Sequence, residues 1–250
     1  MTAPRCFSSE PELFPGLLEL SKEEGRHLSR VRRISVAATV TVLNGRGTVA
    51  QGRVATIDRD RVSIELDQIH SIPPESPEIT LVIGALKQSA WDEVLKHAVE
   101  LGVNRIIRFQ SQHAVSEIKA EKESKKNQRW QECMREACKQ SGNPWVPELV
   151  LADQLETVRQ HLPESAIELL AGLVGTPQSL AEVLPQRLPE KIVVWIGPEG
   201  DFSPAEQQAI QSGGAQVVTL GSRVLRAETA ALALLAHLRL LGNEYNDRLT

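Results

Sequence analysis

The sequence predicts an α/β protein of two domains: a small antiparallel β-barrel, then a larger domain with a parallel sheet covered by helices. Two observations predict this division. Residues 36–66 carry alternating β-branched side chains broken by Gly and Asp turns, whereas strand and helix patterns alternate after the segment 70–78. Three prolines in that segment interrupt regular structure. We therefore expect a first domain at residues 1–72 and a second at residues 73–250.

The elements follow from these patterns in chain order. Barrel strands are expected at residues 36–44, 48–58 and 61–69, with turns between them. In the second domain, apolar runs predict buried strands, and apolar residues at helical spacing predict amphipathic helices. The strands are expected at residues 79–86, 104–109, 166–173, 191–197 and 215–221, and the helices at residues 91–103 and 120–141 and after residues 203 and 226.

Composition excludes several classes of protein. The chain has 250 residues, of which 41% are hydrophobic and 24% charged, and it has no apolar run near the ~18 residues that a membrane span needs. The N-terminus lacks the basic and apolar regions of a secretory signal, so we expect a cytoplasmic protein with no membrane partner. Three cysteines and six histidines at unsuitable spacings predict neither a disulfide framework nor a metal site.

Charge is unevenly distributed along the chain. The net charge is −4, but residues 21–33, "SKEEGRHLSRVRR", contain five basic residues in thirteen positions against two glutamates. Such a cluster attracts a phosphate backbone. It is equally compatible with a solvated helical turn, so it favours nucleic-acid binding only in combination with other signals.

The loop "IGPEGDFSPAE", residues 196–206, follows an apolar strand and precedes a well-marked helix. Ser203 can cap that helix, with Pro204 at its first position and Glu206 completing a capping box. Glycines just past the carboxyl end of a parallel strand suit a ligand site. There is no phosphate-binding loop motif, and Glu199 and Asp201 would repel phosphate. A ligand without phosphate, such as a cationic one, therefore fits this loop better than a nucleotide does. Without other signals, the loop by itself favours an ordinary tight turn whose acids face water.

The segment "LGSRVLRAETAALALLAHLRLL", residues 220–241, repeats the plan of strand, glycine turn and helix. Its Ala/Leu-rich helix carries little charge and must be buried. Arg223 and Arg226 precede that helix and need anionic or polar partners, because an unpaired buried charge is costly. Glu228 is one candidate, which would make a local ion pair.

These two segments resemble the ribosomal RNA small-subunit methyltransferase E family of the trefoil-knotted SPOUT methyltransferase superfamily. The similarity extends to "ALKQSAWDEVLKHAVELGV", "RWQECMREACKQSGNPWVPEL", "HLSRVRR" and "NGRG", and so covers most of the chain. It implies an N-terminal PUA-like RNA-binding barrel and a knotted C-terminal domain that binds S-adenosyl-L-methionine. It also implies a homodimer that methylates N3 of a uridine in 16S ribosomal RNA of the small subunit.

The resemblance assigns roles to individual residues. It makes Arg226 the residue that orients or stabilises the target base. The cofactor pocket would comprise Ile196, Gly197, Glu199, Gly200, Leu220, Gly221 and Leu225. RNA would be bound by His27, Arg30, Arg33, Lys87 and Lys96. A sulfonium donor suits a loop that bears acids, and aligning the two reactants can lower the barrier by about 7–11 kcal/mol.

Three positions depart from the pattern of that family. The family usually has Gly where this chain has Asp201, and Arg where it has His113 and Asn143. The segment "RRISVAA" also lacks the usual glycine and acid. Losing two arginines should weaken phosphate contacts. An alternative function is therefore an RNA-binding dimer with altered or lost methyltransferase activity.

Overall fold

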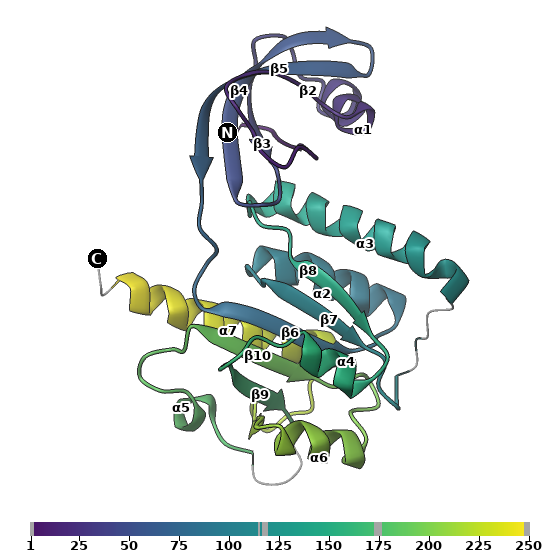
Figure 1. Ribbon diagram of the computed structural model, residues 1–250, viewed down its shortest axis with the longest axis vertical. Helices are drawn as coiled ribbons and strands as arrows, with labels where there is room; N and C mark the ends of the chain where they lie inside the picture. Colours follow the sequence, from purple (N-terminus) through teal and green to yellow (C-terminus); the bar gives the residue numbers. More distant parts are fainter. Residues whose placement is uncertain (1–2, 115, 117–119, 173–176, 248–250) are drawn as a thin grey trace. The chain divides into compact units, whose positions relative to one another are not determined.

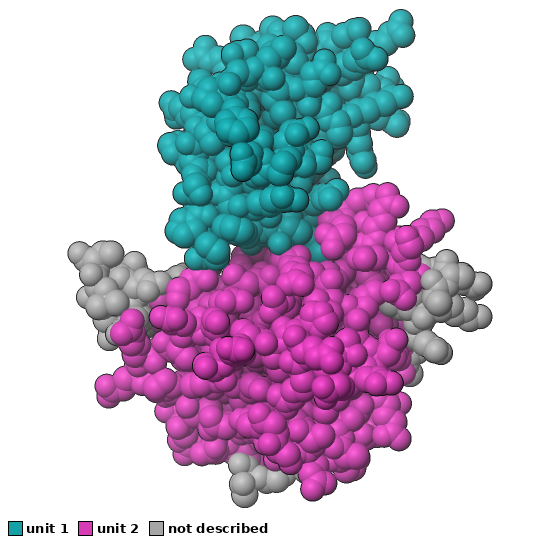
Figure 2. Space-filling view, viewed as in Figure 1, with its two compact units in different colours: residues 1–74, 134–146 teal, residues 75–133, 147–250 magenta. Residues whose placement is uncertain are grey.

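The computed structural model describes residues 3–114, 116, 120–172 and 177–247, and it divides the chain into two compact units (Figure 2). Unit 1 contains Met1–Pro74 and Met134–Val146, and unit 2 contains Glu75–Cys133 and Pro147–Thr250. Each unit has its own sheet and its own hydrophobic core. No helix among the described residues combines the length and apolarity needed to cross a membrane.

Unit 1 is built on a five-stranded sheet with strand order β1-β3-β4-β5-β2 (Figure 1). The strands are β1 Arg5–Phe7, β2 Gly16–Glu19, β3 Thr39–Leu43, β4 Thr48–Asp58 and β5 Arg61–Ser71. Strands β3, β4 and β5 are antiparallel neighbours, which confirms the three strands predicted from alternating residues. Strand β2 pairs antiparallel with β5, and β1 pairs parallel with β3. Neither β1 nor β2 was predicted, because three or four residues carry too little periodicity.

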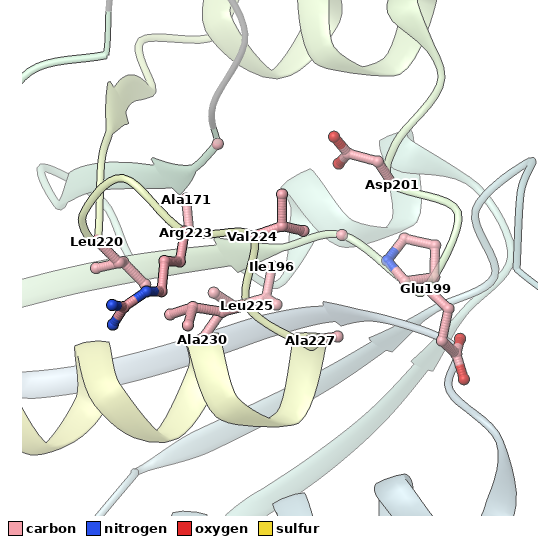
Figure 3. Close-up of a pocket in the computed structure, with 13 residues that line it drawn as sticks. Ala171, Ile196, Glu199, Asp201, Leu220, Arg223, Val224, Leu225, Ala227 and Ala230 are labelled. Atoms are coloured by element: carbon pink, nitrogen blue, oxygen red, sulfur yellow. The ribbon is translucent and has the colours of Figure 1, made fainter.

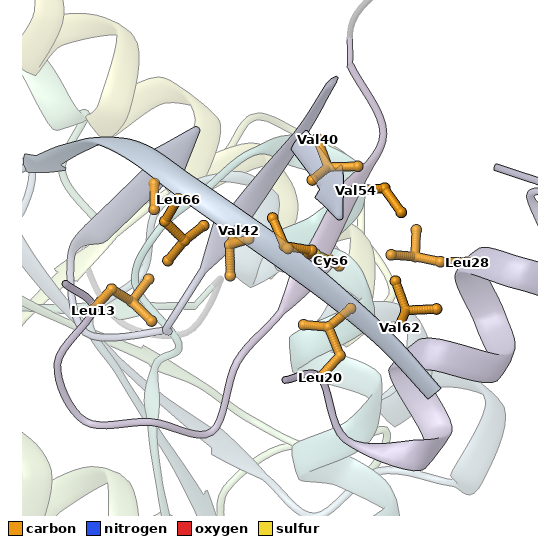
Figure 4. Close-up of a cluster of buried hydrophobic side chains, with 11 residues drawn as sticks. Cys6, Leu13, Leu20, Leu28, Val40, Val42, Val54, Val62 and Leu66 are labelled. Carbon is orange, nitrogen blue, oxygen red and sulfur yellow. The ribbon is translucent and has the colours of Figure 1, made fainter. Parts of the chain in front are cut away.

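Side chains from the inner faces of these strands form one core (Figure 4). Val40 and Val42 of β3 pack with Val62 and Ile64 of β5, as alternation along a half-buried strand requires. A short helix, α1 Lys22–Arg26, continues into a π-helical turn, η1 His27–Val31, and Leu28 of that turn completes the core. Residues 22–31 of the basic segment 21–33 are therefore helical and are anchored to the barrel through Leu28.

The end of helix α3 (Ala120–Ser141) belongs to unit 1. Lys139 is 8% exposed, and its Nζ lies 2.6 Å from Oε1 of Glu24 and 2.6 Å from Oε1 of Glu136. Burial disfavours the ammonium, but hydrogen bonds and the charges of these carboxylates outweigh it, so the pKa of Lys139 is raised. Arg5 donates to the carbonyl oxygens of Lys139 and Gln140. These contacts fix residues 134–146 on the barrel.

Unit 2 is built on a six-stranded sheet in which all pairings are parallel, with strand order β11-β9-β10-β6-β7-β8. The strands are β6 Glu78–Gly84, β7 Arg105–Phe109, β8 Glu148–Ala152, β9 Ile167–Ala171, β10 Lys191–Ile196 and β11 Gln216–Val218. The helices are α2 Gln88–Glu100, α3, α4 Leu155–Gln160, α5 Leu180–Val183, α6 Pro204–Ser212 and α7 Ala227–Asp247. The predicted α/β class with a parallel sheet is confirmed. Residue 173, at the end of one predicted strand, lies outside the described residues.

The central strand β10 is buried on both faces, as expected for a parallel sheet between helices. Val193 and Trp195 pack with Ile210 of α6 in one core cluster, while helices α2 and α7 contact each other and α7 contacts β10. Helices therefore pack on the sheet around β10, and any site at the carboxyl end of β10 follows a buried strand.

Candidate functional site

A pocket lies at the carboxyl ends of three neighbouring parallel strands, β9, β10 and β11 (Figure 3). Its wall is formed by the end of β9, the loops after β10 and β11, and the first turns of α7. The lining residues are Ala171, Gly172, Ile196, Gly197, Pro198, Glu199, Asp201, Leu220, Arg223, Val224, Leu225, Ala227 and Ala230. Open parallel sheets bind their ligands at this edge, so this pocket is the candidate active site.

The loop after β10 is held by the start of helix α6. The predicted capping box is present: the Ser203 N–H donates to Oε2 of Glu206 at 2.8 Å, and the Ser203 hydroxyl accepts from the Glu206 N–H. Within the loop, a Cβ on Gly197 would lie 2.5 Å from Oδ1 of Asp201. Glycine at position 197 therefore lets the chain fold back tightly beside the pocket.

Asp201 occupies a backbone conformation that L-residues rarely adopt, with φ of 59°. Its Oδ1 accepts from the Phe202 N–H at 2.7 Å, and its Oδ2 accepts from Nε2 of Gln207 at 3.2 Å. Asp is among the residues that tolerate this region, because its short side chain hydrogen-bonds locally. The acid that replaces glycine at this position is thus built into the turn.

Neighbouring elements brace this loop through its own polar groups. The Lys87 N–H donates to Oε1 of Glu199 at 3.2 Å, and the Gln112 N–H donates to Oε1 of Glu206 at 2.9 Å. Nδ1 of His113 lies 3.1 Å from the Gly200 carbonyl oxygen. The segments that follow β6 and β7 therefore both support the loop that follows β10.

Arg108, at the end of β7, holds the bracing segment in place. It is 4% exposed, and its guanidinium lies 5.9 Å from the centre of the Trp91 ring and 5.8 Å from that of Trp130. It donates to Oε1 of Gln110 at 3.2 Å and to the Ser116 carbonyl oxygen at 2.6 Å. Burial lowers the pKa of Arg108 to about 10, so it is charged at neutral pH.

The loop after β11 carries two arginines that the structure separates. Arg223 lines the pocket. Arg226 is not a lining residue: its side chain is 86% exposed, and its Nη1 lies 3.9 Å from Oε1 of Glu228. That long, exposed ion pair adds little stability, and it leaves the Arg226 guanidinium accessible to another anion.

The structure brings together most of the residues predicted to bind a cofactor. Ile196, Gly197, Glu199, Leu220 and Leu225 all line the pocket. Gly200 and Gly221 lie in the same two loops but are not lining residues. Other lining residues were not predicted as site residues: Asp201, Arg223 and the alanines 171, 227 and 230. The small side chains at the start of α7 were a usable signal, because they leave room beside the loop.

The residues predicted to bind RNA lie in both units. His27, Arg30 and Arg33 are on or next to η1 in unit 1, while Lys87 and Lys96 are at the start and middle of α2 in unit 2. Arg33 and both lysines are exposed. Nε of Arg30 lies 2.7 Å from Oδ1 of Asp60, so a phosphate would have to compete with that carboxylate.

Two family models match the chain. One, described as an RNA methyltransferase domain, matches residues 74–239, and the other, an RNA methyltransferase PUA domain, matches residues 20–67. The first covers well over half of the chain. The protein therefore belongs to the RNA methyltransferase family, and the predicted PUA-like domain is confirmed.

Individual relatives agree with this assignment. Ribosomal RNA small subunit methyltransferase E of Synechocystis is 29% identical over 96% of this chain and 78% of its own length. The enzyme of the same name from Mycobacterium tuberculosis is 26% identical over 90% of this chain and 86% of its own.

Among solved structures, ribosomal RNA small subunit methyltransferase E of Neisseria gonorrhoeae, bound to S-adenosyl methionine, has a TM-score of 0.86 and 29% identity. The match covers 96% of this chain and 98% of that one. A Legionella pneumophila methyltransferase with bound cofactor has a TM-score of 0.87 and 28% identity, over 96% and 98% of the two chains.

Proposed function

We propose that this protein transfers the methyl group of S-adenosyl-L-methionine to N3 of a uridine in 16S ribosomal RNA of the small subunit. The observation that carries the proposal is the pocket between two glycine-containing loops at the carboxyl edge of the sheet. It bears Glu199 and Asp201, and its loops carry no phosphate-binding loop motif. The cofactor-bound relative from Neisseria gonorrhoeae, which has the same fold, supports this choice.

The lining residues fit the parts of this cofactor. Ile196, Leu220 and Leu225 offer an apolar surface for an adenine ring. The carboxylates of Glu199 and Asp201 suit a ligand that carries positive charge. When bound, the cofactor supplies an electrophilic methyl group. The trefoil knot that the resemblance implies is part of this proposal.

Arg226 is the residue we assign to the target base. A neutral uracil N3 is a poor nucleophile and reacts only as its proton is lost and negative charge develops on the ring. An exposed guanidinium beside the pocket can stabilise that charge through its N–H donors. Arg226 would thereby act on the base while the lining residues act on the cofactor.

RNA capture is assigned to the basic residues of the barrel and of helix α2. His27 and Arg30 lie on η1 and Arg33 follows it in unit 1, while Lys87, the N-cap residue of α2, and Lys96, within α2, are exposed. Phosphate contacts of this kind set affinity and position without reading sequence. The working form is a homodimer in the cytoplasm, in which α7 gains a burial partner.

The test is methyl transfer to purified small ribosomal subunits that lack the modification, measured with labelled cofactor and nucleoside mass spectrometry. The unchanged protein is expected to incorporate label as 3-methyluridine. Arg226→Ala should retain cofactor binding and lose most of the transfer, about 10²-fold or more if it stabilises developing charge. Cofactor binding without methylation by the unchanged protein would instead support the alternative, an RNA-binding dimer without catalysis.

A further inference from the structure

Charge is separated along the candidate cofactor pocket. Figure 3 shows the Arg223 guanidinium at one end, and the carboxylates of Glu199 and Asp201, well apart from each other, toward the other end. The apolar side chain of Ile196 lies between these ends. The pocket therefore presents one cationic and one anionic end to whatever binds.

The charged groups differ in whether they already have hydrogen-bond partners within the protein. Glu199 accepts from the Lys87 N–H, and Asp201 accepts from the Phe202 N–H and from Gln207. Within the described part of the chain, the Arg223 side chain is exposed at the pocket and has no hydrogen bond and no ion pair. A guanidinium that lines a pocket without a partner presents its fork of N–H donors to a ligand, and that fork matches a carboxylate in two parallel hydrogen bonds.

We propose that Arg223 binds the α-carboxylate of the methionine moiety of the cofactor and thereby selects ligands that carry an amino-acid group. This inference rests on the proposed function, since it concerns the same pocket. Its ligand is zwitterionic at that moiety. The ammonium shares the α-carbon with the carboxylate and therefore stays near Arg223, whereas the sulfonium, two methylene groups farther along, can face the anionic end of the pocket.

The two arginines of the loop after β11 thus have different partners. Arg223 lines the pocket and serves the cofactor, whereas Arg226 stands outside the lining and serves the RNA. Both arginines lie between a short strand and a buried helix, and the resemblance assigned a role to Arg226 but none to Arg223. The structure distinguishes them because Arg223 lines the pocket, whereas Arg226 does not and lies near Glu228.

The experiment compares two ligands by isothermal titration. S-Adenosylhomocysteine keeps the amino-acid group, and 5′-methylthioadenosine is the corresponding adenosine thioether without it. Arg223→Ala is expected to weaken binding of the first by about 10- to 100-fold, the range for a charged hydrogen-bonded pair, and to change binding of the second by less than about twofold.

Arg223→Lys should recover only part of the loss, because an ammonium lacks the planar fork. Arg187→Ala, an exposed arginine outside the pocket lining, is the matched control and should leave both affinities unchanged.

Three outcomes would overturn the inference. Equal losses for both ligands would mean that Arg223 only maintains the shape of the pocket. Unchanged affinity for both ligands would mean that it does not contact the cofactor. If the unchanged protein bound neither these ligands nor S-adenosylmethionine, the proposed function itself would fail, and Arg223 would have no cofactor to select.

Discussion

Asp201 illustrates how one residue sets the shape of the candidate site. It holds a left-handed turn that glycine adopts freely, and its carboxylate hydrogen-bonds to the next N–H. Asp201→Ala should lose about 1–2 kcal/mol of unfolding free energy, because alanine keeps the strained backbone conformation but cannot accept the hydrogen bond. Asp201→Gly should lose less, since it loses the bond but relieves the strain. Urea unfolding of both variants measures the difference, and a glycine variant less stable than the alanine variant would contradict this account.

Arg239 of α7 is a second residue whose contacts lead to a specific prediction. It is 6% exposed and donates to the carbonyl oxygens of Leu101 at 3.1 Å, Gly102 at 2.7 Å and Pro77 at 3.1 Å. Arg239→Met keeps most of the volume but leaves these acceptors without a donor. The expected loss is about 2–4 kcal/mol in unfolding free energy, measured by urea denaturation.

The control for this prediction is another arginine near the same helix. Arg226→Met removes an 86% exposed side chain and should change stability by less than about 0.5 kcal/mol. Similar losses in the two variants would mean that the bonds of Arg239 to the carbonyl oxygens do not stabilise unit 2.

At the scale of elements, helix α1 depends on a close approach to the turn between β4 and β5. A Cβ on Gly25 would clash with the carbonyl oxygen of Asp60, which is a backbone atom and cannot swing aside. Gly25→Ala should therefore displace α1 and η1 and weaken RNA binding by about tenfold or more, by the rule that 1.4 kcal/mol corresponds to a factor of ten. Cofactor affinity should be unchanged, because the pocket is made only by unit 2.

Filter binding with an rRNA fragment and titration with cofactor measure these two effects. Glu23→Ala, at an exposed position of the same helix, is the control and should leave cofactor affinity unchanged and RNA affinity equal or slightly higher, since it removes a negative charge. If Gly25→Ala bound RNA as well as the unchanged protein, α1 and η1 would not be part of the RNA-binding surface.

Elements with a long periodic pattern, or with a capping motif that marks where they begin, could be predicted from the sequence. The helix at residues 120–141 was predicted with the bounds it has, and the capping box of Ser203 and Glu206 marked the start of α6. Strand β8 and the short helices α4 and α5 were missed. Five residues at a sheet edge show no clear alternation, and a helix of four to six residues spans too few turns to show an apolar face.

At the scale of the whole molecule, local patterns could not show which parts of the chain join which core. The proline-rich segment predicted a boundary near residue 72, but residues 134–146 belong to unit 1 because Lys139 pairs with Glu24, 115 positions away in the chain. The pocket could likewise be predicted only in part from local patterns. Glycines and acids predicted one of its loops, whereas the roles of Arg223 and Asp201 depend on where side chains point, which spacing alone does not determine.

Dimer formation is a prediction at this scale. Leu240 of α7 is 64% exposed, an apolar side chain that would be covered if α7 forms the interface. Sedimentation equilibrium should give about twice the chain mass of 27.5 kDa, and Leu240→Glu should shift the protein toward monomer. A monomer at micromolar concentration in the unchanged protein would exclude this assembly. A dimer unaffected by Leu240→Glu would place its interface elsewhere.

The central claim is that the pocket at the carboxyl edge of the sheet supports methylation of small-subunit ribosomal RNA at uridine N3. Mass spectrometry of nucleosides from 16S RNA, isolated from cells with and without the gene, tests it most directly. We expect 3-methyluridine to be lost with the gene and restored by the unchanged gene, but not by its Arg226→Ala variant. An unchanged amount of 3-methyluridine in cells without the gene would contradict the claim.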